Sequence, residues 1–395
     1  MNRDPVAFLK EDMTELRRSN LEWIIRYLEE GSKPHSTVDG KKVLMLNTNN
    51  YLGLATHPKV KQAAIDAIKK YGVGAGAVPV IAGSFDLTKK FQEKFAKFKE
   101  VEGSLLCQTG FAVNSGLIPM LVGKPDIVVS DELNHGSIID GVRLSGAGRA
   151  IYKHTDVGDL EKQLKEAEKQ NPRRICIITD GVFSMDGDIA PLDEIVKVAE
   201  DFGAMIFVDD CHGEGVLGEG RGIVAHFNLQ GKVHVEGGSM SKGFGVFGGT
   251  LAGSNDLIEF CANKSRTYLL STAHPPAIVA ANIASIEVVE TEPEHVKRVW
   301  ENTNYFKKEV QNMGYDTGNS ATPIIPLIIG DPGRAQELAR VLFENEGIYG
   351  TPIVFPMVKK ELSRIRVQMN ALLTKDDLNI ALSSIEKIGK KLDII

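Results

Sequence analysis

Short, uninterrupted runs of apolar residues alternate in this chain with segments of helical periodicity, and this alternation constrains the fold most. Ile175–Ile178 and Ala204–Val208 are apolar at every position. A strand of this kind is buried on both faces, which is typical of a parallel sheet covered by helices. A helical segment around Leu192–Val196 lies between the two runs. The pattern therefore predicts an α/β fold with a mainly parallel central sheet.

The length and the change of pattern along the chain predict more than one domain. The chain has 395 residues, which exceeds what one minimal core requires. We predict a large α/β domain over residues 49–276 and a smaller C-terminal α+β domain over residues 277–395. Residues 1–48 are expected to form an N-terminal helix, roughly Glu11 to Tyr27, followed by a short strand at Val43–Leu46.

Composition and charge argue against several classes of protein. The formal net charge of −6 provides no basic field for nucleic acid. No apolar stretch is long enough to span a membrane, and the first residues lack an apolar signal core, so we expect no membrane partner and a cytoplasmic location. The four cysteines form no CxxC pair. Their spacing disfavours a disulfide framework, and no metal site is predicted.

Polar clusters follow the predicted strands at the points where the strands end. They are Gln108–Gly110, Asp131–His135, Thr179–Ser184 and Asp209–His212. The carboxyl ends of parallel strands meet at one edge of a sheet, where ligands gather. We therefore expect these clusters to surround one site.

Lys242 has the most informative surroundings of any charged residue. It lies within Gly237–Gly245, a segment of small residues without another charge. Such surroundings desolvate an amine, which suits imine chemistry. Asp209 and His212 follow the preceding apolar run and supply a carboxylate and an imidazole. This set, with glycine and hydroxyl residues able to hold a phosphate, is typical of pyridoxal phosphate (PLP) enzymes.

Some of these segments and two further positions allow more than one interpretation. Ser239–Lys242 also matches the S-x-x-K pattern of serine acyl-enzymes, although the S-D-N and K-T-G partners of that pattern are absent from the sequence. Gly110 and Phe111 at a predicted helix start offer N–H groups to a phosphate. Arg366 is either an exposed strand arginine or an arginine whose guanidinium binds a carboxylate through two hydrogen bonds. Spacing alone leaves both interpretations of Arg366 open.

From about Asn49 to the C-terminus, the chain resembles the α-oxoamine synthase family of fold-type I PLP enzymes. The matching strings are Asn49–Leu54, Leu133–Gly141, Asp180–Gly187, Val208–His212 and Ser239–Lys242. The resemblance implies the PLP-dependent transferase fold of type I, like that of aspartate aminotransferase. It also implies an acyltransferase that joins an amino acid to an acyl-CoA and releases CoA.

The resemblance implies roles around the cofactor ring. Lys242 would hold PLP as an imine and later move the Cα proton. Asp209 would keep the pyridinium nitrogen protonated, and His135 would stack on the ring and contact the substrate. His212 and Ser184 would contact the side of the ring that carries the phenolic oxygen.

The resemblance also implies how the phosphate is held. The backbone of Gly110 and Phe111 would bind it, with help from Ser239. Ser271 and Thr272 match phosphate contacts that the partner subunit contributes. A homodimer with a shared active site is therefore expected.

Two further residues match positions that face the substrate. Arg366 matches the arginine that binds the substrate carboxylate, and Asn50 matches a residue near the substrate. The chain departs from the family pattern at Pro79, at Thr88 and at Leu373 together with the leucine before it.

Within the family, the string Arg364–Ala371 looks most like glycine C-acetyltransferase. The predicted reaction is therefore the condensation of glycine with acetyl-CoA, giving 2-amino-3-oxobutyrate and CoA. The alternatives are 8-amino-7-oxononanoate synthase, which uses alanine and a pimeloyl thioester, and an enzyme like serine palmitoyltransferase. Another fold-type I reaction, such as transamination, is also open. A catalytically silent subunit is disfavoured, because Lys242, Asp209 and His135 are all present.

Overall fold

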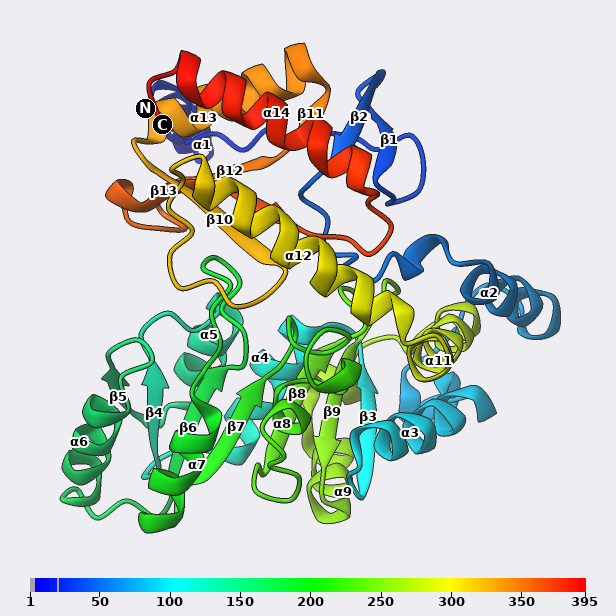
Figure 1. Ribbon diagram of the computed structural model, residues 1–395. Coiled ribbons are helices and arrows are strands. Elements are labelled where there is room, and N and C mark those ends of the chain that lie inside the picture. The colour runs from blue at the N-terminus through cyan, green and yellow to red at the C-terminus, as the bar shows by residue number, and fades with distance from the viewer. Residues whose placement is uncertain (1–3, 20) are drawn as a thin grey trace.

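A seven-stranded sheet forms the centre of the larger part of the molecule in the computed structural model, which describes residues 4–19 and 21–395 (Figure 1). Its strands are β3 (Gly103–Cys107), β4 (Ile127–Asp131), β5 (Gly148–Tyr152), β6 (Ile175–Asp180), β7 (Met205–Asp209), β8 (Val235–Ser239) and β9 (Gly249–Gly253). They lie in the order β3-β9-β8-β7-β6-β4-β5. β9 is antiparallel to its neighbours β3 and β8, and the other neighbouring strands of this sheet pair in parallel. The predicted mainly parallel sheet is therefore confirmed.

Both faces of this sheet are buried, as the continuous apolar runs require. Ile177 and Ile206 belong to one hydrophobic cluster, and Cys176 and Phe207 belong to another. Successive side chains of a strand point to opposite faces, so each strand feeds both clusters. The first cluster includes residues of α6 (Val157–Glu168) and α7 (Leu192–Asp201), and the second includes residues of α4 (Gly110–Leu121) and α5 (Gly136–Ser145).

The remaining helices of this part lie around the sheet. At one end of it, α11 (Pro276–Thr291) packs along α2 (Pro58–Tyr71) and α3 (Asp86–Lys99). The shorter helices are α8 (Ile223–His226), α9 (Asn255–Lys264) and α10 (Arg266–Leu269), with single turns at η1 (Leu54–Thr56), η2 (Pro79–Gly83) and η3 (Gly218–Gly220). α2 begins at Pro58, as expected from the fixed φ of proline at a first helical position.

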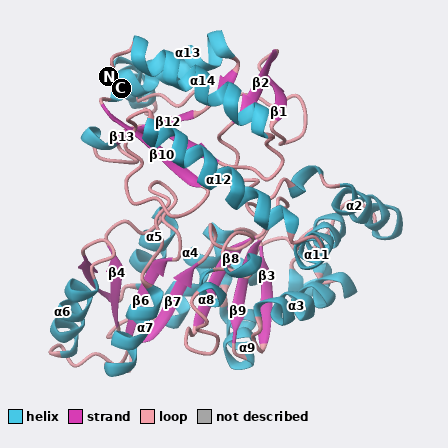
Figure 2. Ribbon diagram, viewed as in Figure 1, coloured by secondary structure: helices cyan, strands magenta, loops and turns pink. Residues whose placement is uncertain are grey.

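Two three-stranded sheets form the smaller part, which lies above the large sheet in Figure 1 and Figure 2. One contains β10 (Ile324–Gly330), β13 (Ser363–Gln368) and β12 (Thr351–Ile353), and the other contains β1 (His35–Val38), β2 (Lys41–Met45) and β11 (Ile348–Tyr349). The helices are α1 (Ala7–Arg18), α12 (Glu294–Asn312), α13 (Pro332–Val341) and α14 (Lys375–Lys391), with short turns η4 (Leu342–Glu346) and η5 (Lys360–Leu362). The pairing of β2 with β11 joins the N-terminal segment to the C-terminal part. The domain boundaries at residues 48 and 276 stay a prediction.

The N-terminal helix is shorter than predicted. α1 ends at Arg18, Asn20 lies outside the described residues, and residues 21–27 form no helix. The N–H of Tyr27 donates to Asp39 Oδ1 at 2.9 Å, and Leu28 forms an antiparallel bridge with Val38. Pairing beside β1 therefore overrides the helical pattern of this segment.

All four cysteines are free and buried. Across residues 4–19 and 21–395, no helix combines the length and the apolar character needed to cross a membrane.

Candidate active site

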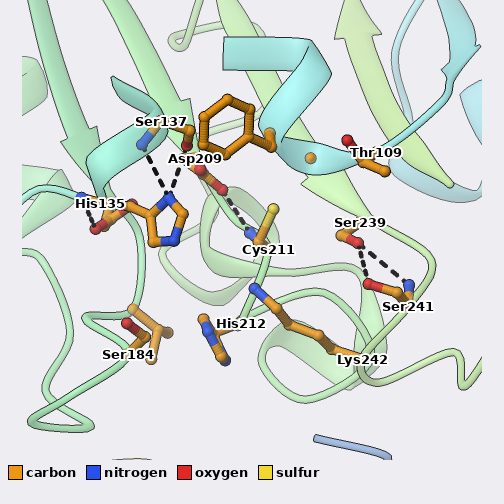
Figure 3. Close-up of a pocket in the computed structure, with 14 residues that line it drawn as sticks. Thr109, His135, Ser137, Ser184, Asp209, Cys211, His212, Ser239, Ser241 and Lys242 are labelled. Atoms are coloured by element: carbon orange, nitrogen blue, oxygen red, sulfur yellow. Dashed lines mark hydrogen bonds between the residues drawn. The ribbon is translucent and has the colours of Figure 1, made fainter. Parts of the chain in front are cut away.

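A cavity of about 220 Å³ lies at the edge of the large sheet where its parallel strands end (Figure 3). All four polar clusters predicted to surround one site contribute to it, together with the segment after β8. The lining residues are Thr109, Gly110, Phe111, His135, Ser137, Asp180, Val182, Ser184, Asp209, Cys211, His212, Ser239, Ser241 and Lys242. The topology of the sheet thus brings together residues that are far apart in the sequence.

Asp209 is the last residue of β7, and its buried carboxylate has two donors. Asn114 Nδ2 donates to Oδ2 at 2.5 Å, and the Cys211 N–H donates to Oδ1 at 2.9 Å. These bonds fix the orientation of the carboxylate. Asn114 lies one turn into α4 and was missed by sequence reasoning. A buried amide four residues after Gly110, on a mainly apolar helix, was the available signal.

His135 is held at the N-terminus of α5. Its N–H donates to Asp180 Oδ2 at 2.8 Å, and its Nδ1 lies 2.7 Å from Ser137 Oγ. Burial lowers the pKa of His135, Asp209 opposes this shift, and Lys242 adds to it. The neutral ring is therefore favoured, as stacking on an aromatic cation would require.

His212 is buried beside Tyr51. Its Nδ1 lies 2.8 Å from the Tyr51 hydroxyl. Burial lowers the pKa of His212 well below its usual range, and the nearby charges of Lys242 and Arg366 lower it further. Burial also raises the pKa of Tyr51 to about 12, so the hydroxyl keeps its proton. Sequence reasoning assigned Tyr51 no role, although the residue lies within the string Asn49–Leu54.

The start of α4 offers an anion site at the other side of the cavity. Thr109 caps the helix by accepting from the Ala112 N–H at 3.0 Å. The first N–H groups of a helix have no partner within it, which leaves those of Gly110 and Phe111 for a ligand. A Cβ on Gly110 would lie 2.6 Å from Cys211 Sγ. Glycine is therefore the residue that allows this close approach.

Lys242 lies in the turn after β8, and its amine points into the cavity toward Cys211 and His212 (Figure 3). The turn is anchored, because the Gly245 N–H donates to the Lys242 carbonyl at 2.9 Å. Ser239 Oγ and Ser241 Oγ lie 2.7 Å apart on the same segment. The cavity therefore contains an amine, a carboxylate, neutral imidazoles and a helix start flanked by hydroxyls.

Comparison with known proteins identifies the family. The chain matches the family Aminotransferase class I and II over residues 41–385. An 8-amino-7-oxononanoate synthase from Thermoanaerobacter pseudethanolicus is 50% identical over 389 residues, which cover 98% of each chain. The chain belongs to the α-oxoamine synthase family.

Solved structures of other members show the same fold. Serine palmitoyltransferase from S. paucimobilis with a bound PLP–myriocin aldimine has a TM-score of 0.93 and 28% identity, with 100% of both chains covered. An 8-amino-7-oxononanoate synthase from Francisella tularensis has a TM-score of 0.76 and 26% identity, covering 89% of this chain and 99% of that one. The chain is thus a fold-type I, PLP-dependent acyltransferase, as predicted. The S-x-x-K hydrolase alternative has no support among these relatives.

The cavity of this α-oxoamine synthase suits PLP at each of its polar ends. The hydrogen-bonded carboxylate of Asp209 suits a cationic ring nitrogen, and the amine of Lys242 suits an aldehyde. The start of α4 suits a phosphate. Gly110 allows the helix to begin this close to Cys211, because a Cβ at that position would collide with the sulfur. Ser239 and Ser241 also line the cavity.

A buried charge cluster lies beneath this phosphate end. Glu214 Oε2 accepts from the Ser239 N–H at 3.1 Å. Lys99 Nζ lies 3.0 Å from Glu236 Oε2 and 3.3 Å from Glu214 Oε1, and Asp210 Oδ2 lies 3.8 Å away. All four side chains are nearly inaccessible to solvent. Sequence reasoning missed this cluster, because Lys99 precedes its partners by a long stretch of chain.

Two predicted substrate residues lie outside the cavity lining. Arg366 on β13 donates through Nε to the Ser184 carbonyl and through Nη1 to Asn49 Oδ1 at 3.4 Å. Among the described residues, nothing hydrogen-bonds to its buried Nη2. Asn50 donates to the Ser32 carbonyl at 2.8 Å and accepts from the Ala55 N–H at 3.3 Å. The amide of Asn50 is thus engaged with backbone, whereas Arg366 keeps one free nitrogen.

The remaining predicted residues are also away from the lining. Ser271 and Thr272 follow α10, and the Thr272 carbonyl accepts from Gln108 Nε2 at 3.1 Å. The departures from the family pattern at Pro79, Thr88 and Leu373 do not line the cavity either. Within the described residues, these departures therefore leave the lining of the cavity unchanged.

Proposed function

We propose that this α-oxoamine synthase condenses alanine with a pimeloyl thioester to give 8-amino-7-oxononanoate. The observation that carries the proposal is the 50% identity, over 98% of each chain, with an 8-amino-7-oxononanoate synthase. Alanine and a pimeloyl group together hold one carbon more than this product. The alanine carboxylate would therefore leave as carbon dioxide, and the thiol would leave from the thioester.

The relatives do not support the first interpretation, which was glycine and acetyl-CoA. That interpretation rested on strings such as Arg364–Ala371 and Asp180–Gly187. These strings surround the cofactor cavity and Arg366, and every α-oxoamine synthase must bind PLP and an amino acid. Strings of this kind therefore say little about the acyl group.

Lys242 and Asp209 would carry the central chemistry. Bound PLP supplies an electron sink that stabilises negative charge at the substrate Cα. The Lys242 amine would hold the cofactor covalently and, once released, take the Cα proton as a general base. The Asp209 carboxylate, fixed by Asn114 and the Cys211 N–H, would hold the proton on the ring nitrogen. His135 would cover one ring face and contact the substrate.

Other residues would position the cofactor and the substrate. His212, held by Tyr51, and Ser184 would lie on the side of the phenolic oxygen. Gly110, Phe111 and Ser239 would bind the phosphate. Asn50 would act only through the backbone that it holds near the substrate, because both ends of its amide are engaged.

A homodimer with a shared active site would explain why Ser271 and Thr272 lie away from the cavity of their own chain. Neither lines the cavity of its own chain, and the adjacent Leu270 is 69% exposed. Phe111, at the cavity itself, is 51% exposed. A second copy that covers these apolar side chains would bring its Ser271 and Thr272 to the phosphate. A fully active monomer in sedimentation equilibrium would contradict this arrangement.

A matrix of substrates tests the proposed function. PLP-loaded enzyme is supplied with glycine, alanine or serine and with acetyl-, succinyl-, pimeloyl- or palmitoyl-CoA, and free CoA thiol is measured. Release is expected to be fastest with alanine and pimeloyl-CoA. Fastest release with glycine and acetyl-CoA would restore the first interpretation. No release from a yellow, PLP-loaded protein would overturn both.

Replacement of Arg366 tests its proposed contact with the amino-acid carboxylate. Arg366→Ala is expected to raise the KM for the amino acid roughly 30-fold or more, because a buried charged hydrogen-bonding partner is lost. The KM for the thioester and the PLP absorbance should change little. Arg149→Ala, at an exposed arginine of β5, is the control. An unchanged KM for the amino acid in Arg366→Ala would remove the assigned role.

A further inference from the structure

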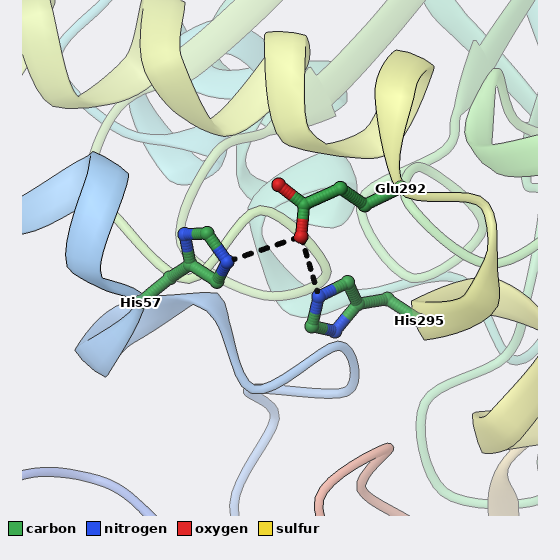
Figure 4. Close-up of side chains that lie close together, drawn as sticks. All are labelled: His57, Glu292 and His295. Atoms are coloured by element: carbon green, nitrogen blue, oxygen red, sulfur yellow. Dashed lines mark ion pairs between the residues drawn. The ribbon is translucent and has the colours of Figure 1, made fainter.

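Two histidines and a glutamate meet outside the cavity, where α2 begins and α11 passes into α12 (Figure 4). His57 immediately precedes α2, Glu292 follows the last residue of α11, and His295 lies in the first turn of α12. One ligand atom from each residue lies within 4.8 Å of the other two. None of these residues has a part in the proposed reaction. The sequence analysis predicted no metal site, and His57 is far from the other two residues along the chain.

The distances within this cluster match metal ligation better than hydrogen bonding. Glu292 Oε2 lies 3.4 Å from His57 Nε2 and 3.6 Å from His295 Nε2. An N–H···O bond is usually about 2.7–3.2 Å long. Two ligand atoms of a tetrahedral zinc ion, each bound at about 2.0–2.1 Å, lie about 3.3 Å apart. Small side-chain adjustments would place all three atoms around one ion.

The orientation of His295 is fixed by the backbone. Its Nδ1 lies 3.1 Å from the Leu52 carbonyl oxygen. A carbonyl only accepts, so Nδ1 carries the hydrogen, and in the neutral ring the lone pair of Nε2 faces Glu292. A backbone carbonyl that fixes the tautomer in this way is the usual support of a metal-binding histidine. A lone pair and a carboxylate oxygen that face each other favour a cation between them.

The charge and access of the cluster also suit a cation. Lys59 Nζ lies 2.6 Å from Glu292 Oε1, which leaves Oε2 to face both imidazoles. The Lys59 side chain is 64% exposed and is free to turn toward water when an ion arrives. The three ligand side chains are only 9–22% exposed, so one side remains open for entry.

We propose that His57, Glu292 and His295 bind one divalent ion of the zinc type, with water in the fourth position. Two imidazole nitrogens and one carboxylate oxygen suit Zn²⁺, whereas Ca²⁺ and Mg²⁺ prefer oxygen ligands alone. The ion would tie the loop of Leu52 to the junction of α11 and α12. Tyr51, which holds His212, lies in the same loop, so the ion would steady this wall of the active site.

Competition of tag-free holoenzyme with a chromogenic Zn²⁺ indicator tests the proposal. Wild-type protein is expected to take up one equivalent of Zn²⁺ per chain with a Kd below about 1 μM. His57→Ala and Glu292→Gln are each expected to weaken this binding by roughly 100-fold. His226→Ala, which removes an exposed histidine of α8, should leave the affinity unchanged. Zn²⁺ should raise the melting temperature of the wild type but not of His57→Ala.

Substitution of Lys59 gives a result that a purely structural ion pair would not produce. Lys59→Gln removes the cation that competes for Glu292 and is expected to tighten Zn²⁺ binding about two- to five-fold. No Zn²⁺ binding by the wild type would overturn the proposal. Equal affinities in the wild type and in a folded His57→Ala or Glu292→Gln protein would also overturn it, because the ion would then bind elsewhere, for example at the cavity histidines.

Discussion

Replacement of Lys242 by alanine is expected to abolish turnover and the covalent attachment of PLP. The kcat should fall by roughly 10⁴-fold or more, because in the proposed mechanism the same amine would hold the cofactor and would serve as the general base. The fold should be preserved, since the Lys242 side chain lies in the cavity and contributes little to the core. PLP would still bind through its phosphate contacts, but without a covalent bond.

Borohydride reduction followed by peptide mass spectrometry measures this attachment directly. In the wild type, PLP should be found on the peptide that contains Lys242, and in Lys242→Ala no lysine should carry it. Lys264→Ala, at an exposed residue of α9, is the matched control and should behave like the wild type. PLP found on another lysine of the wild type would contradict the assignment.

The electrostatics around Lys242 explain how a histidine-rich site avoids a second cation beside the amine. Burial lowers the pKa of both His135 and His212, and the Lys242 charge lowers it further. At a pH below its usual pKa, a histidine in water is protonated. Because the pKa of these two rings is lowered, they stay neutral over a wider range of pH. Asp209 lies in the same cavity and accepts a hydrogen bond from Asn114 Nδ2.

The sheet was predictable from the sequence because burial on both faces leaves a direct signature. Ile175–Ile178 and Ala204–Val208 cannot alternate with polar residues when helices cover both sides. The polar clusters after these strands were predictable for a related reason, because parallel strands end at one edge. The end of α1 was not predictable in this way, since the path of the following segment depends on its contacts with Asp39 and Val38.

Within the site, residues that line the cavity were easier to predict than the residues that hold them in place. Lys242 and Asp209 lie in short strings that match a family, whereas Asn114 and Tyr51 act through a hydrogen bond to another side chain. Such a contact depends on how α4 and the loop of Tyr51 pack, which no local pattern encodes. The acyl group was harder to predict, because the strings that match the family surround the cavity and Arg366 and carry little information about it.

The buried cluster of Lys99 gives the largest expected effect on stability. Lys99→Met is expected to lower the free energy of unfolding by about 3–5 kcal/mol, because Glu214, Glu236 and Asp210 would remain buried without a cation. The midpoint of urea unfolding measures the loss. Lys97→Met, on the exposed side of the same helix, should shift that midpoint little.

The pH dependence of this variant identifies the carboxylates as the cause. Burial raises the pKa of Glu214 and of Asp210 above their ordinary values of 4.5 and 3.8. When the pH rises above these ordinary values, the unfolded state releases protons that the native state still binds. Stability from these groups is therefore lost as the pH rises, and loss of the Lys99 charge increases that loss. The difference in unfolding free energy between Lys99→Met and the wild type should shrink toward acid pH and grow toward neutral pH.

Addition of Glu236→Gln to Lys99→Met should recover part of the stability, because one of the uncompensated carboxylates is removed. A pH-independent difference, or no recovery in the double variant, would show instead that packing of the lysine stem determines the effect.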